Sequence, residues 1–472
     1  MSEQIQKKPE MTRRKRNMIF LNLVITCIAS SMLATALTTA LPAVIEDLEI
    51  SVTTGQWLTS GYSLAMAIIM PLTAFLITRF PTRRLYLTGI SVFLAGLVLC
   101  IIAPNFPAVM AARVLQAAGN GILSSMAQVI ILSIYPAEER GTAMGWYGLS
   151  IGAAPVIAPT VAGFIVDLIS WRAIFAIAAV IMAAALITAC FVFDDVLETS
   201  KKKFDMPSFI ISIFAFGGIT LGIGNIGSYD FLSPQVLPVL IVGGAAAVIF
   251  VYRQLHTEQP FLELRILKNR NYFLSVAGSM LLYFVMMGSS ILMPLYAQSV
   301  MGYSATVSGL IVLPGSAVMA VISPFAGRIY DRLGIRILFV TGSSAMLLSC
   351  LGMVFVHTGT PVIVAALWNV LRCASIGFLM MPFVTWGTES IRRDLTAHGT
   401  ALLTSLRTVA GAVGTAVFVA VMSSVAEGSA EKYGSEASMH GINIAYLCMG
   451  CVTVLLLLIG IFGVGNGKKR TE

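Results

Sequence analysis

The chain has 472 residues, of which 57% are hydrophobic and only 11% are charged. A soluble protein needs roughly 25% charged residues to cover its surface, so this composition excludes a string of soluble domains. Collagen-like, disordered and coiled-coil chains are excluded as well, because they need repeats or a polarity that this chain lacks. The sequence therefore predicts an all-α polytopic membrane protein, since a backbone buried in lipid must satisfy its hydrogen bonds within helices.

Apolar segments of about 20 residues, the length that crosses the hydrocarbon layer, alternate with short polar loops along the chain. They predict fourteen membrane-spanning helices. In chain order the predicted spans are 18–42, 57–78, 85–103, 107–135, 143–166, 172–193, 207–226, 233–252, 272–299, 305–327, 337–357, 361–387, 398–425 and 441–463.

The positions of the basic residues predict the orientation of these spans. Of the 30 Lys and Arg, 25 fall on the side of the N-terminus, two on the other side, and three inside spans. Because positive loops stay in the cytoplasm, both termini are expected to be cytoplasmic. The net charge of +8 is then explained by topology, and nucleic acid is not expected as a partner.

The chain resembles itself at an offset of about 250 to 260 residues. Three pairs of residues occupy equivalent places in the two copies: Pro71 and Pro324, Arg113 and Arg372, and Gly141 and Gly399. Six spans are thus repeated in parallel, which is a plan found in transporters that bind substrate between two halves near the midplane. Alternate exposure of that site to the two sides would move the substrate across the membrane.

The repeat divides the chain into five parts. A basic tail, 1–17, precedes an N-terminal six-helix bundle, 18–193. A linker with two extra spans, 194–271, leads to a C-terminal six-helix bundle, 272–463, and a short tail, 464–472.

The loop after the tenth span carries glycine and charge in a regular pattern. Its residues are Gly327, Asp331, Arg332, Gly334 and Arg336. A carboxylate and guanidinium groups at the ends of helices can pair with neighbouring helix ends and hold a gate closed. The loop after the second span keeps Arg79 but has Thr78 where the other copy has Asp, so a weaker latch is expected there. Ordinary positive-inside charge is the alternative explanation of the arginines, but it does not explain Asp331.

Three arginines lie inside predicted spans: Arg113, Arg372 and Arg407. A charge at that depth is unfavourable by about 3 kcal/mol or more unless it is paired or hydrated. We expect a functional role for these embedded arginines, with snorkelling of Arg113 to the outer surface as the alternative.

The fifth span is rich in glycine and proline. The pattern comprises Gly148, Gly152, Pro155, Pro159 and Gly163. Small residues allow close helix packing in lipid, and proline bends a helix by removing a hydrogen bond.

With the segment 293–304 at the junction of spans nine and ten, these motifs resemble those of the major facilitator superfamily. Within it they are similar to the 14-span drug:proton antiporter group, over about residues 18–463. The resemblance implies two pseudo-symmetric six-helix bundles plus two linker helices, and a multidrug efflux transporter in the bacterial cytoplasmic membrane. It implies no cofactor, with the proton gradient as energy source, a lipophilic small molecule as substrate, the lipid bilayer as surroundings, and a monomer. It also implies a role in proton coupling for the embedded arginines, Arg113, Arg372 and Arg407.

One departure from the family pattern concerns the proton carrier. Leu33 stands where this group usually has an Asp in the first span, and none of the 22 acids falls in mid-membrane. The remaining candidates lie near the ends of spans: Asp205, Asp331 and Glu389 on the inner side, and Glu46, Asp47 and Asp167 on the outer side.

The expected cavity lies between spans 1, 2, 4 and 5 and their counterparts. Aromatic, Met and amide side chains are expected to line it: Tyr62, Gln116, Asn120, Trp146, Met286, Trp368, Asn369 and Met380. Because embedded arginines without an acid make the interior positive, we expect neutral, zwitterionic or anionic amphiphiles as cargo.

The sequence thus predicts a secondary-active exporter of lipophilic or amphiphilic small molecules, working by proton antiport and alternating access. The alternatives are an importer or facilitator of a specific metabolite in the same fold, and a membrane sensor that transports nothing. An enzyme is not expected, because the chain has no P-loop, HExxH or nucleophile motif.

Overall fold

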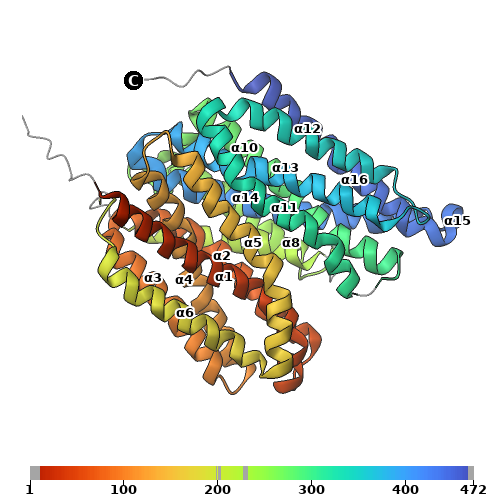
Figure 1. Cartoon of the computed structure of the whole chain (residues 1–472), viewed down its shortest axis with the longest axis horizontal. Helices are drawn as coiled ribbons and strands as arrows, with labels where there is room; N and C mark the ends of the chain where they lie inside the picture. Colours follow the sequence, from red (N-terminus) through yellow and green to blue (C-terminus); the bar gives the residue numbers. More distant parts are fainter. Residues whose placement is uncertain (1–10, 198, 200–203, 227–231, 304, 466–472) are drawn as a thin grey trace, which may run out of the picture.

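The computed structural model describes residues 11–197, 199, 204–226, 232–303 and 305–465, except for some side chains inside helices. Within these residues the fold is helical and contains no strand. The helices run roughly alongside one another, with the N-terminal half and the C-terminal half side by side (Figure 1).

The helices correspond to the predicted spans. Thirteen described helices are long and apolar enough to cross a membrane. The 29-residue helix α5 occupies the place of the predicted fifth span. The first half comprises α1 (Arg13–Asp47), α2 (Val52–Arg79), α3 (Thr82–Ile102), α4 (Phe106–Ile134), α5 (Arg140–Leu168) and α6 (Trp171–Val192).

The linker and the second half follow in chain order. The linker holds α7 (Met206–Ser212), the π-helix η1 (Ile213–Gly217), α8 (Gly218–Asn225), α9 (Leu237–His256) and the 3-10 helix η2 (Leu264–Lys268). The second half holds α10 (Arg270–Leu295), η3 (Tyr296–Val300), α11 (Ala305–Leu333), α12 (Ile335–Val354), α13 (Val362–Glu389), η4 (Arg393–Leu395), α14 (Thr396–Gly428), α15 (Ala430–Tyr433), η5 (Gly434–Glu436), α16 (Ala437–Leu458) and η6 (Ile459–Gly463).

Local signals in the sequence set several of these boundaries. Ser51 and Asn105 accept hydrogen bonds from backbone N–H groups in the first turns of α2 and α4, which satisfies donors that have no partner within the helix. Gly334 has φ of +78° in the tight turn between α11 and α12, a conformation that disfavours side chains with a Cβ.

The two halves repeat one packing pattern. In the first half α1 packs on α5 and α6, α2 on α4, and α3 on α4 and α6. In the second half α10 packs on α14 and α16, α11 on α13, and α12 on α13 and α16. The cross-half contacts also form an equivalent pair, because α5 packs on α11 and α2 packs on α14.

The linker helices pack together beside the interface between the halves. Gly218 and Gly243 bring α8 and α9 so close that a Cβ on Gly218 would lie 2.9 Å from the Cα of Gly243. The pair rests on α2 of the first half, and α8 also contacts α14 of the second half.

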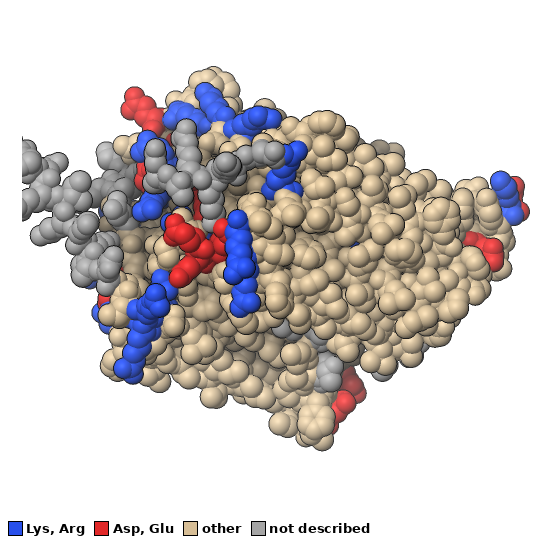
Figure 2. All heavy atoms as spheres, turned by 45° about the horizontal axis from the view of Figure 1, so that its top comes forward, with Lys and Arg blue, Asp and Glu red and all other residues tan. Residues whose placement is uncertain are grey.

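Charged side chains gather mainly toward one end of the molecule, and a broad uncharged surface covers most of the face shown in Figure 2. We call the end that carries Arg79–Arg84, Arg140, Arg328–Arg336 and Arg392–Arg393 the basic end. The hydrophobic core of the first half continues into the second half at this end, through Tyr272, Val276, Met381, Val384 and the start of α14. The two halves are therefore packed together there.

Gly119 tests how closely the helices of one half must approach. A Cβ at this position would lie 2.6 Å from the backbone N of Phe93 and 2.8 Å from the carbonyl O of Gly89. Gly119→Ala should therefore push α3 and α4 apart and lower the free energy of unfolding by about 1–3 kcal/mol. Gly244→Ala is the matched control, because that position has nothing within 4 Å and alanine favours the helix. Thermal unfolding in detergent should show a lower Tm for the first variant only.

Candidate transport site and gate

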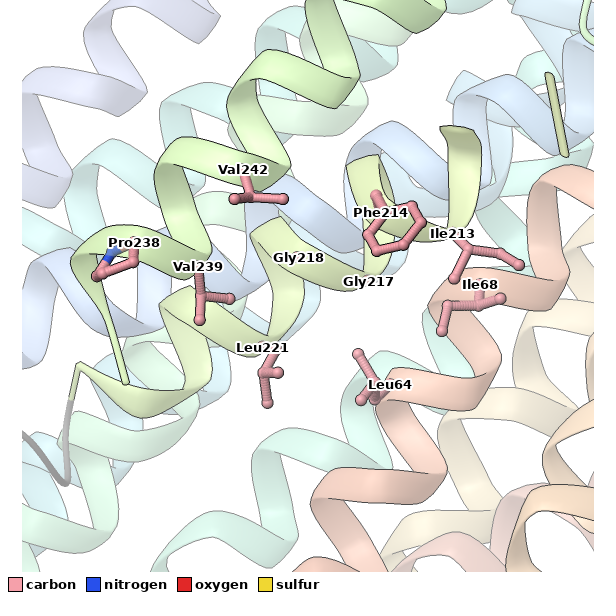
Figure 3. Close-up of a pocket in the computed structure, with 10 residues that line it drawn as sticks. All are labelled: Leu64, Ile68, Ile213, Phe214, Gly217, Gly218, Leu221, Pro238, Val239 and Val242. Carbon is pink, nitrogen blue, oxygen red and sulfur yellow. The ribbon is translucent and has the colours of Figure 1, made fainter. Parts of the chain in front are cut away.

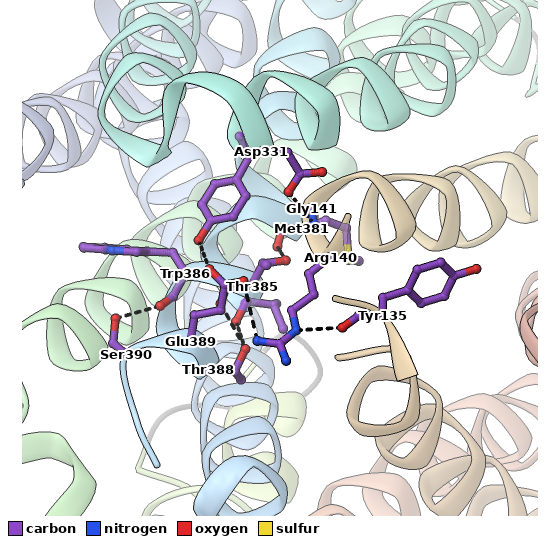
Figure 4. Close-up of polar contacts among 12 residues, drawn as sticks. Tyr135, Arg140, Gly141, Asp331, Met381, Thr385, Trp386, Thr388, Glu389 and Ser390 are labelled. Carbon is purple, nitrogen blue, oxygen red and sulfur yellow. Dashed lines mark hydrogen bonds and ion pairs between the residues drawn. The ribbon is translucent and has the colours of Figure 1, made fainter. Parts of the chain in front are cut away.

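Asp331, in the last turn of α11, caps a helix of the other half. Its Oδ1 accepts a hydrogen bond from the Gly141 N–H at 2.9 Å. Its Oδ2 accepts from the N–H of Thr142 at 2.7 Å and from the hydroxyl of Thr142 at 2.6 Å (Figure 4). The residue that precedes α5, Glu139, supplies no side-chain cap, so the carboxylate from the second half satisfies the start of this helix. Charge–dipole attraction at a helix N-terminus adds to these bonds.

Glycines allow α5 and α11 to touch backbone to backbone beside this cap. A Cβ on Gly327 would lie 2.0 Å from the carbonyl O of Gly141, and a Cβ on Gly145 would lie 2.5 Å from the carbonyl O of Ser323. Neither position can accept a larger residue without separating the helices. The contact therefore closes the basic end between the halves.

The same face of α5 packs against the second half up to the middle of the helix. Beyond that point it no longer faces α11. Gly148 lies against Met381 and Ser323, and Gly152 lies against Met319 and Ala320. Among the described residues, a Cβ on Gly163, close to the other end, would have only Thr39 of α1 within 4 Å. Pro155 and Pro159 belong to α5, but their side chains lie outside the described residues.

A second cross-half contact surrounds Glu389, the last residue of α13. The Tyr330 hydroxyl donates to Glu389 Oε2 at 2.6 Å, and Arg140 Nη1 lies 3.8 Å from Glu389 Oε1 (Figure 4). Arg140 is itself fixed by a hydrogen bond from its Nε to the carbonyl of Tyr135. A cavity of about 720 Å³ adjoins this cluster at the basic end, and Arg392 and other polar residues around Glu389 line it.

The equivalent position in the first half carries no carboxylate. Thr78 is buried, and its hydroxyl donates to the carbonyls of Ala74 and Phe75 in its own helix. Arg79 and Arg332 are exposed, and Arg336 is half-buried. The Asp-mediated cap thus joins α11 to α5, whereas the Thr78 hydroxyl donates to carbonyls of its own helix, α2.

Arg113 is held by the first half. It is 1% exposed, and its Nη1 donates to Gln116 Oε1 at 2.7 Å while its Nε donates to the Leu58 carbonyl at 3.2 Å. Its guanidinium also lies 4.1 Å from the centroid of the Tyr62 ring, whose hydroxyl accepts a hydrogen bond from Asn120. This network compensates the charge within one half, and snorkelling to the surface is excluded by the burial of the side chain.

Arg372 occupies the equivalent site in the second half. It is 4% exposed, and its guanidinium donates to Asn369 Oδ1 and, at 3.3 Å, to the hydroxyl of Tyr446. The pairing repeats that of Arg113 in mirror order, since the amide partner precedes Arg372 by three residues and follows Arg113 by three.

Arg407 differs from both. It is 6% exposed, and its Nε and Nη1 have no hydrogen-bond partner among the described residues. Its guanidinium lies 4.8 Å from the centroid of the Tyr283 ring on α10.

Comparison with known proteins is consistent with this architecture. The family model of the Major Facilitator Superfamily matches residues 20–415. The uncharacterized MFS-type transporter YcnB of Bacillus subtilis is 37% identical over 426 residues, which cover 90% of this chain and 89% of YcnB. The lincomycin resistance protein LmrB of Listeria innocua is 33% identical over 434 residues, covering 90% of this chain and 92% of LmrB. The solved structure of the proton:xylose symporter XylE superposes with a TM-score of 0.66 at 17% identity, over 95% of this chain and 96% of that one.

The chain belongs to the major facilitator superfamily. This membership confirms the predicted family and fold class, and it makes the chain a multi-pass membrane transporter and not an enzyme.

The predicted cavity residues of this transporter fall into separate groups. Tyr62, Gln116 and Asn120 belong to the Arg113 network, and Asn369 belongs to the Arg372 pair. Met380 packs against both hydrophobic clusters, the one that extends from the first half into the second and the one of the second half.

The other three lie elsewhere. Trp368 packs its ring against Gly352 of α12, and Met286 packs against the core of the second half. Trp146 is 43% exposed.

An apolar hollow of about 370 Å³ lies outside the predicted cavity. It is formed between α2 and the linker helices and is lined by Leu64, Ile68, Ile213, Phe214, Gly217, Gly218, Leu221, Pro238, Val239 and Val242 (Figure 3). Phe214 and Val242 are more than half exposed, which places this hollow on the outer surface of the bundle.

Several functional contacts were not predicted from the sequence. Tyr330, Tyr446 and Tyr283 each contact a charged residue of the site, but a tyrosine in an apolar run gives no signal of such a partner. The contact between Arg140 and Glu389 has a clearer signal in the sequence. The two residues lie at the start of α5 and the end of α13, where contacts between the halves are expected.

The candidate acids also separate by their surroundings. Burial alone would raise the pKa of Asp205, but hydrogen bonds from Arg253 and Ser208 lower this pKa below its usual value. Asp205 is therefore ionised at neutral pH and is a poor proton carrier. In the described spanning helices every acid lies within the last three residues of its helix, as the sequence predicts.

The cap on α5 can be tested directly. Asp331→Asn removes the negative charge and one acceptor, so three bonds to α5 weaken and the basic end should open more often; charge-assisted bonds contribute about 1.5–3 kcal/mol each. In a chain without its native cysteines, Ser323→Cys, a position 5% exposed under α5, reports opening by its rate of labelling with an impermeant maleimide. We expect faster labelling in the Asp331→Asn background.

Asp394→Asn is the control, because Asp394 is exposed at the same end and pairs with Arg392 two residues away. Equal labelling rates in the wild-type and Asp331→Asn backgrounds would show that the cap does not hold this end closed.

Proposed function

We propose that this protein is a secondary-active exporter of lipophilic or amphiphilic small molecules, driven by proton antiport through alternating access. One observation carries the proposal: the carboxylate of Asp331 joins the two halves at the basic end by three hydrogen bonds to α5. A reversible contact between halves at one end is what an alternating-access gate requires.

The distribution of contacts along α5 supports this interpretation. Near the basic end this helix lies directly on α11, whereas a Cβ on Gly163 near its far end would meet, among the described residues, Thr39 of α1 alone. The arrangement corresponds to a state closed at the basic end, which positive-inside charge predicts to be cytoplasmic. Opening there would require the cap and the glycine contact to separate together.

The direction of transport is supported by two features. The glycine face of α5 matches the pattern expected for family members that export by antiport. LmrB, a lincomycin resistance protein, is a relative over nearly the whole chain, and resistance requires that a compound be kept out of the cell.

Proton coupling must use groups other than a mid-membrane acid. Leu33 is 2% exposed and packs in the core of the first half, so this position offers no titrating group. Asp331 and Glu389 fit the coupling role better, because each carboxylate contacts groups across the interface at the basic end. A proton on either one removes negative charge that holds this end closed, which favours opening.

Transport in liposomes tests the function. With N-phenyl-1-naphthylamine and lincomycin as probes, we expect accumulation that depends on an imposed pH gradient and collapses when a protonophore removes the gradient. Arg113→Ala should lower the flux, since it leaves the Leu58 carbonyl and Gln116 without their buried donor, while Arg328→Ala, an exposed control, should not.

Gradient-independent flux in the wild type would contradict antiport. Net uptake, seen by comparing right-side-out with inverted vesicles, would instead favour an importer or facilitator in the same fold.

A further inference from the structure

The three embedded arginines are not equivalent, and the difference points to the cargo. Arg113 and Arg372 each donate two hydrogen bonds to acceptors of their own half. Arg407 donates none to any described residue and forms no ion pair with one. Its contact with the Tyr283 ring offsets part of the desolvation of the charge, by about 0.5–2 kcal/mol for such a cation–π pair. Two of its nitrogens remain buried without an acceptor.

Arg407 also lies where the two halves meet. It is eleven residues after the start of α14, or about 17 Å along the helix, near the middle of a hydrocarbon layer about 30 Å thick. Tyr283 on α10 contacts it from the second half. On the side of the first half, α14 packs against α2 and α4. A ligand between the halves at this depth would be within reach of the guanidinium.

Other buried donors follow the same helix face. Thr400 and Thr404 precede Arg407 by seven and three residues, a spacing that places all three on one side of α14. Both threonines are buried, and their hydroxyls have no hydrogen-bond partner among the described residues. Ser125 on α4 also carries a buried hydroxyl without a hydrogen-bond partner among the described residues, and α4 packs against α14. Native proteins normally satisfy such groups, so a row of them at the interface indicates a site for a polar ligand group.

The chemistry of this group is defined by the arginine. A planar guanidinium with free N–H donors binds carboxylate, sulfonate or phosphate oxygens through parallel hydrogen bonds, and hydroxyls can donate to the same oxygens. The Tyr283 ring supplies an aromatic face beside the guanidinium.

We propose that Arg407 binds the anionic head of an amphiphilic cargo, and that Arg113 and Arg372 do not contact cargo. This inference rests on the proposed exporter function and identifies amphiphiles that carry a carboxylate, sulfonate or phosphate as the preferred members of its substrate class. Arg407 is the specificity-determining residue, because binding its guanidinium to an anion compensates a charge that the protein leaves unpaired.

A pair of probes with one aromatic body isolates the head group. 8-Anilinonaphthalene-1-sulfonate carries a sulfonate that N-phenyl-1-naphthylamine lacks. Binding of each is measured by fluorescence titration of the full chain in phosphatidylcholine nanodiscs, with empty nanodiscs subtracted. We expect the wild type to prefer the sulfonate, and Arg407→Gln to weaken sulfonate binding by about tenfold or more while the neutral probe stays within about twofold.

Variants separate the site from general damage. Arg407→Lys should retain intermediate sulfonate binding, because it keeps the charge but not the fork. The exposed control Arg328→Gln should leave both probes unchanged. The Tm of Arg407→Gln should equal or exceed that of the wild type, since no hydrogen bond among described residues is lost, whereas Arg113→Gln and Arg372→Gln should lower it.

Parallel loss of both probes, equal binding of both by every variant, or no binding by the wild type would overturn the proposal. Phosphatidylglycerol added to the nanodiscs distinguishes the source of the anion. Displacement of the sulfonate would assign the site to a lipid head group and overturn the assignment to cargo, whereas unchanged binding supports an amphiphilic cargo. Flux measured with a pH gradient tests the exporter function separately. Loss of gradient-dependent flux would contradict antiport and leave Arg407-dependent binding intact, and loss of that binding would leave antiport intact.

Discussion

The contact between the start of α5 and the end of α11 is the constraint on which the arrangement of the two halves depends. Lipid offers no hydrophobic driving force between helices, so association must come from close packing and polar bonds. Here Gly141 and Gly327 provide the close packing, and Asp331 provides the polar bonds. Because the glycines bring the backbones together, a short Asp side chain reaches the first N–H groups of α5. Both features are needed at one place, and together they define a state closed at the basic end.

The fold was largely predictable because lipid imposes simple rules on a sequence. Long apolar runs had to be helices, and the repeat of Pro71, Arg113 and Gly141 at Pro324, Arg372 and Gly399 indicated two parallel halves. The matching sets of helix contacts in the two halves agree with that repeat. Helix ends were less predictable: α1 begins at Arg13 and ends at Asp47, well beyond the apolar run, because polar residues at a membrane surface can continue a helix in water.

The site was predicted only in part, because composition identifies charged groups but not their partners. The scarcity of charge drew attention to the three arginines, and the spacing of Arg113 from Gln116 is compatible with their bond. Arg372 donates hydrogen bonds to Asn369 and Tyr446, whereas Arg407 donates none to a described residue. This difference depends on the rotation of each helix and on residues distant in the sequence. Trp368 was expected in a cavity, yet its ring packs on Gly352. An aromatic side chain in a span can be buried against several apolar surfaces, and the sequence does not indicate which one.

The energies of the two sites are of a size that allows them to act on one another. Three charge-assisted bonds at Asp331, each of about 1.5–3 kcal/mol, favour the closed basic end by only a few kcal/mol after the loss of water contacts is included. The buried cation of Arg407, which donates no hydrogen bond to a described residue, opposes the packed state by a similar amount. A ligand shifts such an equilibrium only by the difference between its affinities for the two states. An anion that pairs with Arg407 removes the unfavourable free energy of the buried charge in the state to which it binds. If it binds one state better than the other, it therefore influences whether the contact at the basic end forms. Arg113 and Arg372 each donate two hydrogen bonds within their own half, whereas Arg407 donates none to a described residue, so the proposed anion site would couple the chemistry of the centre to the packing of the two halves.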